Sequence, residues 1–175
     1  MHMLGVLIMS YVCKTCGNTH EDLPDVGFQY PDHYFGVPET ERESRIKCST
    51  DLCVINNEHY FIRGVILIPI HNYEEDFGIG VWVSLNKENY EKYEENPNTP
   101  DIGPFFGWLC NSILCYDEET QLLKTMVHFQ SNGQRPMIDL EPCEHKLYQD
   151  YSQGISVDEA WEMAHRYYPV DKDNA

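Results

Sequence analysis

The sequence predicts an α+β domain with a mainly antiparallel sheet, a zinc-knuckle-like N-terminus and C-terminal helices. Two observations predict this class: strand-like runs come before helical ones, and a Cys-x-x-Cys-Gly motif stands near the start. A chain of 175 residues supports one well-buried core and is short for two domains. We therefore expect a single domain over residues 11–170, with a knuckle at 11–23 and a tail at 171–175.

The first ten residues are apolar but contain no Lys or Arg and no small-residue cleavage site, which is a poor signal peptide. We expect residues 1–10 to be a tag or a non-native start. No apolar run approaches the roughly 20 residues that span a bilayer. A cytoplasmic location follows by default.

The cysteine count also bears on location. Seven cysteines cannot all pair within one chain. Their spacing favours reduced thiols and a metal site over an extracellular disulfide scaffold.

The net charge of −17 restricts the partners. Such a surface repels phosphate backbones and anionic lipids, which argues against nucleic acids and membranes. It favours a basic protein partner. The alternative is an acidic surface that serves only solubility.

The N-terminal motif predicts a metal site. Cys13 and Cys16 can direct both sulfurs at one tetrahedral ion, and Gly17 permits the tight turn behind them. His20 is a third ligand within reach. For the fourth ligand we favour Cys53, with Cys48 as its competitor, so that a structural zinc ion would tie the knuckle to the sheet.

Two other interpretations of the motif remain open. Three ligands with an open position would make a catalytic metal site, with Glu21 or Asp22 as an acid or base. A redox dithiol would require a helix directly after the motif, and no helical pattern follows Gly17. The chain contains no His-Glu-x-x-His motif, Ser-His-Asp elbow or phosphate-binding glycine loop, so we assign no catalytic residue.

The first half of the domain alternates loops and strands. Residues 22–38 read as an ordered loop with aromatic side chains, and residues 38–45 as a short helix that opens with Pro and acids. Asn56-Asn57-Glu58 separates two β-rich runs, which predicts a hairpin because Asn tolerates positive φ. The strands expected here are 51–55, 59–68 and 77–85. Asn86 then caps a polar helix to about residue 95.

The second half ends in helices. Residues 105–109 form an aromatic buried segment, and strands are expected at 122–130 and 136–140 around an intervening turn. A helix over 144–151 stops at Gly154. Ser156 and Glu159 form a capping box that opens a last helix to about residue 168.

Other polar residues are given structural roles. His59 and His128 lie in strand-like segments, where we expect cross-strand or core positions, and His145 is expected to bond a nearby carbonyl from a helix. Arg63 lies inside an apolar strand and needs an anionic partner if it is buried.

Several of these segments resemble a bacterial family, domain of unknown function 2199. The resemblance rests on the Cys13-x-x-Cys16-Gly17-x-x-His20 opening and covers roughly residues 11–168. Further matching segments are Ser49-x-Asp51-Leu52-Cys53-Val54-Ile55, Phe61-Ile62-Arg63-Gly64, Gly80-Val81-Trp82-Val83-Ser84-Leu85, Phe106-Gly107-Trp108-Leu109, Arg135-Pro136, His145-x-Leu147 and Gln153-Gly154-Ile155-Ser156. The resemblance implies no activity, and it leaves Cys48, Cys110, Cys115 and Cys143 outside the matching motifs.

Two functions are consistent with these features. The first is an acidic cytoplasmic protein-binding module with structural zinc, including the case of an immunity-type inhibitor of a basic toxin. The second is a metal-dependent, hydrolase-type enzyme that uses the Cys/Cys/His site. We favour the first; the sequence does not indicate an oligomeric state.

Overall fold

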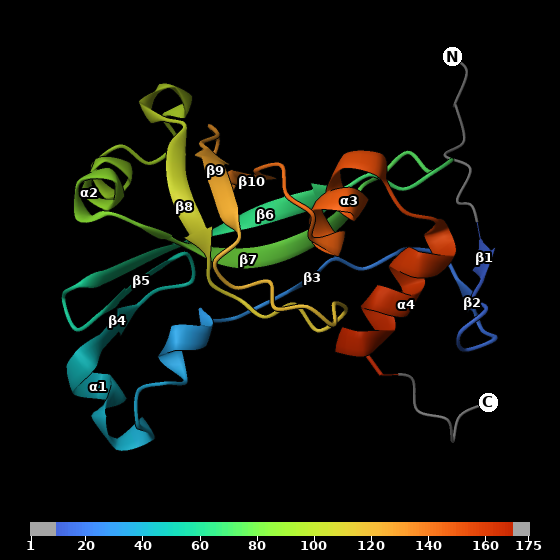
Figure 1. Ribbon diagram of the computed structural model, residues 1–175, viewed down its shortest axis with the longest axis horizontal. Coiled ribbons are helices and arrows are strands. Elements are labelled where there is room, and N and C mark those ends of the chain that lie inside the picture. The colour runs from blue at the N-terminus through green and yellow to red at the C-terminus, as the bar shows by residue number, and fades with distance from the viewer. Residues whose placement is uncertain (1–9, 170–175) are drawn as a thin grey trace, which may run out of the picture.

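Five strands close into a mixed barrel in the computed structural model, which describes residues 10–169 (Figure 1). The ring runs β6–β7–β8–β9–β10 and back to β6. Its strands are β6 (His59–Ile68), β7 (Phe77–Leu85), β8 (Phe105–Leu109), β9 (Lys124–His128) and β10 (Met137–Leu140). Neighbours are antiparallel except β10 and β6, which pair in parallel where Met137 faces Val65.

The remaining described strands extend the sheet or stand apart. From β6 the sheet continues through β5 (Leu52–Ile55) to β4 (Ile46–Cys48), and β3 (Val26–Gly27) lies parallel to β7. Asn56 and Asn57 turn the β5–β6 hairpin with φ of 58° and 53°, which confirms the predicted turn. Separately, β1 (Tyr11–Val12) and β2 (Thr19–His20) form a two-stranded hairpin. The mixture of strands and helices is confirmed, but two parallel pairings make "mainly antiparallel" only partly correct.

Helices α2 and α4 begin at the capping residues that the sequence predicts. The Asn86 side chain accepts a hydrogen bond from the Asn89 N–H at the start of α2, and both hydrogen bonds of the Ser156–Glu159 capping box are present. The helices are α1 (Arg42–Arg45), α2 (Lys87–Glu95), α3 (Lys146–Gln153) and α4 (Val157–Tyr167), with 3-10 turns η1 (Asp32–Tyr34), η2 (Glu39–Glu41) and η3 (Pro100–Ile102). Among residues 10–169, no helix has the length and hydropathy to cross a bilayer.

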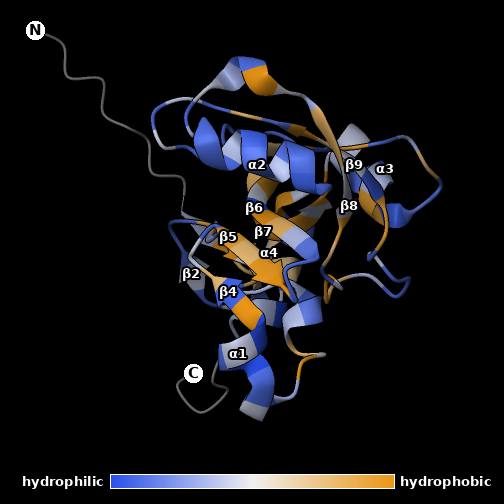
Figure 2. Ribbon diagram, turned by 90° about the vertical axis from the view of Figure 1, so that its left-hand side faces the viewer, coloured by the Kyte–Doolittle hydropathy of each residue, from blue (hydrophilic) through white to orange (hydrophobic). Residues whose placement is uncertain are grey.

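The core lies in and around the barrel. Seven of the nine residues of β7 are buried, because both of its faces are covered. From α4, Trp161 and Ala164 join this core, so the last helix is anchored by apolar packing. A smaller cluster around Trp82 and Phe61 lies beneath the loop that leads to α1. Figure 2 shows the hydrophobic strands inside and the hydrophilic α2 on the surface.

Candidate metal centre

The first two cysteines lie in a tight hairpin loop between β1 and β2. The Gly17 N–H donates to the Cys13 carbonyl at 2.8 Å, and the Cys13 N–H donates to the Asn18 carbonyl at 2.9 Å. Gly17 has φ of +76°, a conformation that side chains with a Cβ rarely adopt. The turn therefore brings the two sulfurs to one side of the hairpin, as the motif predicts.

Four potential ligand atoms meet at this hairpin, contributed by Cys13, Cys16, His20 and His165. All four lie within 4.8 Å of one another. His165 Nε2 is 3.3 Å from the Cys13 Sγ, and His20 Nε2 is 3.1 Å from the Cys16 Sγ. Zinc bonds of about 2.0–2.3 Å in a tetrahedron require ligand atoms roughly 3.3–3.8 Å apart, so this set could close around one ion with little movement.

The protonation of two of these groups suits metal binding. Burial raises the pKa of the Cys13 thiol, but hydrogen bonds from the Cys16 backbone and His165 outweigh it and bring the pKa to about 7. Burial and the neighbouring His165 lower the pKa of His20. Thiolate sulfur and neutral imidazole are the forms that bind zinc.

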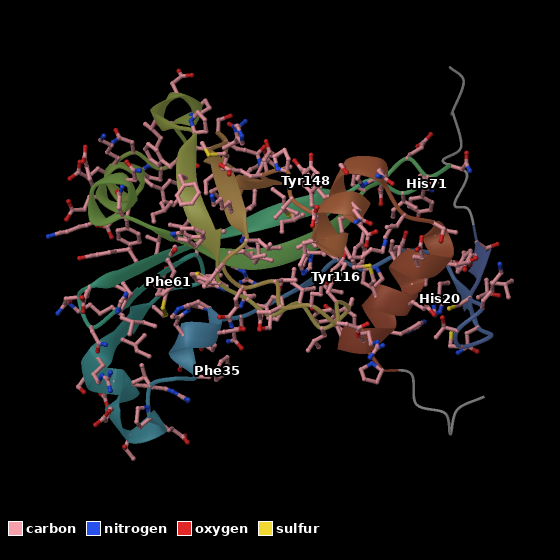
Figure 3. The ribbon with its side chains drawn as sticks, viewed as in Figure 1. His20, Phe35, Phe61, His71, Tyr116 and Tyr148 are labelled. Atoms are coloured by element: carbon pink, nitrogen blue, oxygen red, sulfur yellow. A yellow bond between two sulfur atoms is a disulfide. The ribbon has the colours of Figure 1, made fainter. Side chains whose placement is uncertain are left out.

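Helix α4 holds the hairpin in place. The His20 ring stacks on Trp161 with ring centres 4.0 Å apart, and Tyr11 stacks on the same indole at 6.2 Å. Lys14 and Asp158 form an exposed ion pair at 2.8 Å. Figure 3 shows His20 between the hairpin and α4. The cluster thus joins the two ends of the described chain.

Cys53 does not belong to this cluster. It is fully buried in the smaller core and forms a disulfide with Cys48, directly opposite it in the β4–β5 pair. A disulfide sulfur is no thiolate ligand, so the expectation that Cys53 or Cys48 joins the cluster is corrected: His165 is the fourth residue there. The disulfide also limits the expectation of reduced thiols to the other five cysteines.

The other polar residues singled out in the sequence lie elsewhere. His145 caps α3, where its Nδ1 accepts the Leu147 N–H at 3.0 Å, and its Nε2 lies 3.3 Å from the Glu118 carbonyl. His128 contacts Asp139 on the adjacent strand at 2.9 Å. Glu21 and Asp22 are exposed and do not join the ligand cluster found in residues 10–169.

Sequence reasoning missed His165 because it stands 152 residues after Cys13. One signal points to it: His165 follows Trp161 by four residues, so both share a face of the predicted last helix. A buried tryptophan with a histidine one turn later marks a face that packs against another element. That signal does not say which element packs there.

Comparison with known proteins finds a match to a protein-family model. Residues 12–155 match the model of a family described as "Uncharacterized protein conserved in bacteria (DUF2199)". The match includes the Cys-x-x-Cys motif and His20 and ends ten residues before His165. No curated protein and no solved structure matches the chain.

Proposed function

Because the chain belongs to the bacterial family DUF2199, whose description assigns no activity, we propose a function from its own residues: an acidic protein-binding module with a structural zinc site. The observation that carries this proposal is the Cys₂His₂ ligand set of the metal centre. Soft sulfur and imidazole ligands select zinc over hard cations.

The number of ligands favours a structural site. Catalytic zinc sites use three protein ligands and keep a position for water, whereas structural sites use four. His165 lies 3.3 Å from the Cys13 sulfur and would fill the position that a water molecule needs. The enzyme alternative, built on Cys13, Cys16 and His20 alone, would require His165 to stay unbound.

The surface supports a protein partner of opposite charge. Four exposed glutamates lie on α2, and Phe106 and Trp108 are each 39% exposed on β8 with their rings edge to face. Exposed aromatics supply contact energy at interfaces, and opposite charges speed association. We propose a basic partner, and an immunity-type inhibitor of a basic toxin is the narrower form of this proposal.

The metal part is tested by elemental analysis and by melting the full chain before and after chelation. We expect one tightly held zinc per chain and a melting temperature that falls by roughly 5–10 °C when zinc is removed. Protein that binds no zinc, or that melts identically without it, would contradict a structural metal.

The binding part is tested by affinity capture from the bacterial host with the wild-type chain and a Trp108→Ala variant. Trp108 is partly exposed, so the variant should keep its fold while losing the partner. The captured protein should be basic, and its association rate should fall about tenfold between 50 and 300 mM salt. A partner that binds both forms equally, or without salt dependence, would rule out this surface.

A further inference from the structure

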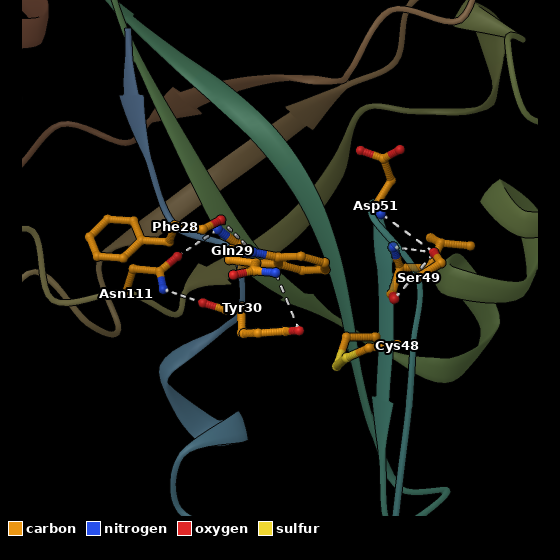
Figure 4. The surroundings of a disulfide bond; sticks show 10 residues. Phe28, Gln29, Tyr30, Cys48, Ser49, Asp51 and Asn111 are labelled. Carbon is orange, nitrogen blue, oxygen red and sulfur yellow. Dashed lines mark hydrogen bonds between the residues drawn. A yellow bond between two sulfur atoms is a disulfide. The ribbon is translucent and has the colours of Figure 1, made fainter. Parts of the chain in front are cut away.

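A pocket of about 600 Å³ lies on the far side of the molecule from the metal centre, beside β4 and the loop before α1. Figure 4 shows Gln29 and Tyr30 on one side of this space and Cys48 and Ser49 on the other. The lining is mainly polar. It includes Arg42 and Arg63, two of only 12 basic residues in a chain with 29 acids.

Among residues 10–169, Arg63 on β6 forms no ion pair with a carboxylate, and Asp51 attracts it only from beyond ion-pair distance. Its Nε is shielded from solvent and has no hydrogen-bond acceptor in this part of the chain, and its Nη1 makes one long bond of 3.4 Å to the Thr50 carbonyl. The neighbouring Asp51 is bonded to Arg135 at 2.7 Å. Arg63 is half-buried, and partial burial of a cation that lacks a direct anionic partner costs free energy, so the position favours an anion from outside the chain.

Arg42, which also lines the pocket, is held in a fixed orientation. Its Nε donates to the Val37 carbonyl at 3.1 Å, and its guanidinium lies 4.7 Å from the centre of the Tyr34 ring. Tyr30 stacks on Tyr34 with ring centres 3.9 Å apart, which fixes that ring in turn. Among residues 10–169, neither Nη of Arg42 has a protein acceptor or an ion-pair partner.

We propose that Arg42 and Arg63 bind the oxyanion of a small molecule, a carboxylate or a phosphate group, in this pocket. Guanidinium groups match both oxyanions through paired N–H donors. Tyr30 lines the same space, and its hydroxyl, which accepts a hydrogen bond from the Gln29 amide, can donate a further one. The volume lies in the range of small-molecule sites, and the net charge of −17 disfavours a polyanion.

Glu43 also lines the pocket, so changing it tests whether the bound ligand is negatively charged. Its carboxylate opposes an anionic ligand, so Glu43→Gln should tighten binding. Arg45 is a matched control on the same helix: it is bonded to Glu41 at 2.6 Å and to Asn56 at 2.8 Å, and does not line the pocket.

The experiment is calorimetric titration of the full chain with inorganic phosphate and, separately, with malonate, at constant ionic strength set by sodium chloride. We expect phosphate, malonate or both to bind saturably at one site. The anion that binds shows whether the pocket recognises a phosphate or a carboxylate group. Arg42→Gln and Arg63→Gln should each weaken binding at least tenfold, Arg45→Gln should leave it unchanged, and Glu43→Gln should tighten it two- to fivefold.

The proposal is overturned if neither anion binds beyond the chloride control. It is equally overturned if Arg45→Gln weakens binding as much as Arg42→Gln, since general electrostatics would then explain the effect. Circular dichroism checks the fold of each variant. If Arg63→Gln does not fold, the other two variants decide the outcome: anion affinity should fall in Arg42→Gln and rise in Glu43→Gln.

Discussion

His165 supplies the fourth potential ligand atom of the Cys/His cluster from the last turn of α4. The ring lies 5.7 Å from the Trp161 indole and 5.4 Å from the His20 ring, so packing orients it towards the hairpin. Cys53, the ligand favoured from the sequence, instead faces Cys48 across an antiparallel pair. Two cysteines at opposite positions of a β-hairpin are adjacent as soon as the hairpin forms. Contact between either of them and the N-terminal loop would instead require long-range packing.

The first prediction distinguishes His165 from Cys53 as the fourth zinc ligand. His165→Ala should lower zinc affinity about a hundredfold or more, because loss of an outer partner alone costs 10–100-fold and this change removes a ligand. The double variant Cys48→Ser/Cys53→Ser should bind zinc as the wild type does. Competition with a chromophoric chelator measures both. Zinc loss in the double variant, with retention in His165→Ala, would restore the Cys53 assignment.

Glu159 closes the capping box at the start of α4, the element that carries His165. The hydrogen bond from the Ser156 N–H to the Glu159 carboxylate, at 2.8 Å, is the main cause that lowers the pKa of Glu159 below its ordinary value. A carboxylate whose folded pKa is depressed adds stability above its unfolded pKa. That stability is lost as the pH falls through the folded pKa.

The second prediction follows from this shift. Glu159→Gln keeps the capping-box shape but removes the charge, so it should cost about 0.5 kcal/mol at pH 7, a typical value for an exposed charge at a helix N-terminus. The difference should shrink towards zero as the pH falls through the lowered folded-state pKa of Glu159. Urea unfolding of both proteins from pH 7 to pH 3.5 measures it. A cost that is independent of pH would show that the charge does not contribute.

Elements were predictable where the signal is local. The Asn56-Asn57 turn, the Asn86 cap and the Ser156–Glu159 capping box all stand where the sequence places them, because each depends on neighbouring residues. The short strands β3 and β4 were missed. Each has two or three residues and is defined by its partner, so neither leaves a periodic pattern in the chain.

Closure of the barrel depends on the parallel approach of β10 to β6, between segments about 70 residues apart. Gly64 allows it: a Cβ at this position would lie 2.6 Å from the Ile138 side chain and 2.8 Å from the Pro136 carbonyl oxygen. Sequence patterns show that both segments are strands, but not that they pair. The Phe61-Ile62-Arg63-Gly64 segment therefore did not reveal that the sheet closes on itself.

The third prediction tests this contact. Gly64→Ala should destabilise the protein by about 2 kcal/mol or more, because the Pro136 backbone cannot move aside as a flexible side chain would. Gly80→Ala on β7 is the matched control, since its Cβ would meet Gly27 at an ordinary 3.6 Å and should change stability little. Equal melting temperatures for the two variants would show that the barrel tolerates separation of β6 and β10.

At the scale of the whole molecule, different interactions attach the β1–β2 hairpin and helix α4 to the rest of the protein. Helix α4 is anchored by Trp161, Met163 and Ala164 in the main core. The hairpin is attached by ring stacking on Trp161, by the exposed Lys14–Asp158 pair, by the buried Cys13 side chain and by contacts within the Cys/His cluster. Exposed ion pairs contribute about 0–1 kcal/mol, so under the proposed function we expect a metal bound by the cluster to contribute most to the attachment of the hairpin.

The last prediction is that chelation releases the hairpin while the barrel stays folded. Hydrogen exchange should accelerate at least tenfold in residues 11–20, while β6 and β7 keep their protection. Cys13→Ser should reproduce the pattern without chelator, and Cys143→Ser, at an exposed cysteine outside the cluster, should not. Exchange that rises equally in β7 would mean that the metal supports the whole core. Unchanged exchange in the hairpin would mean that ring stacking alone holds it against α4.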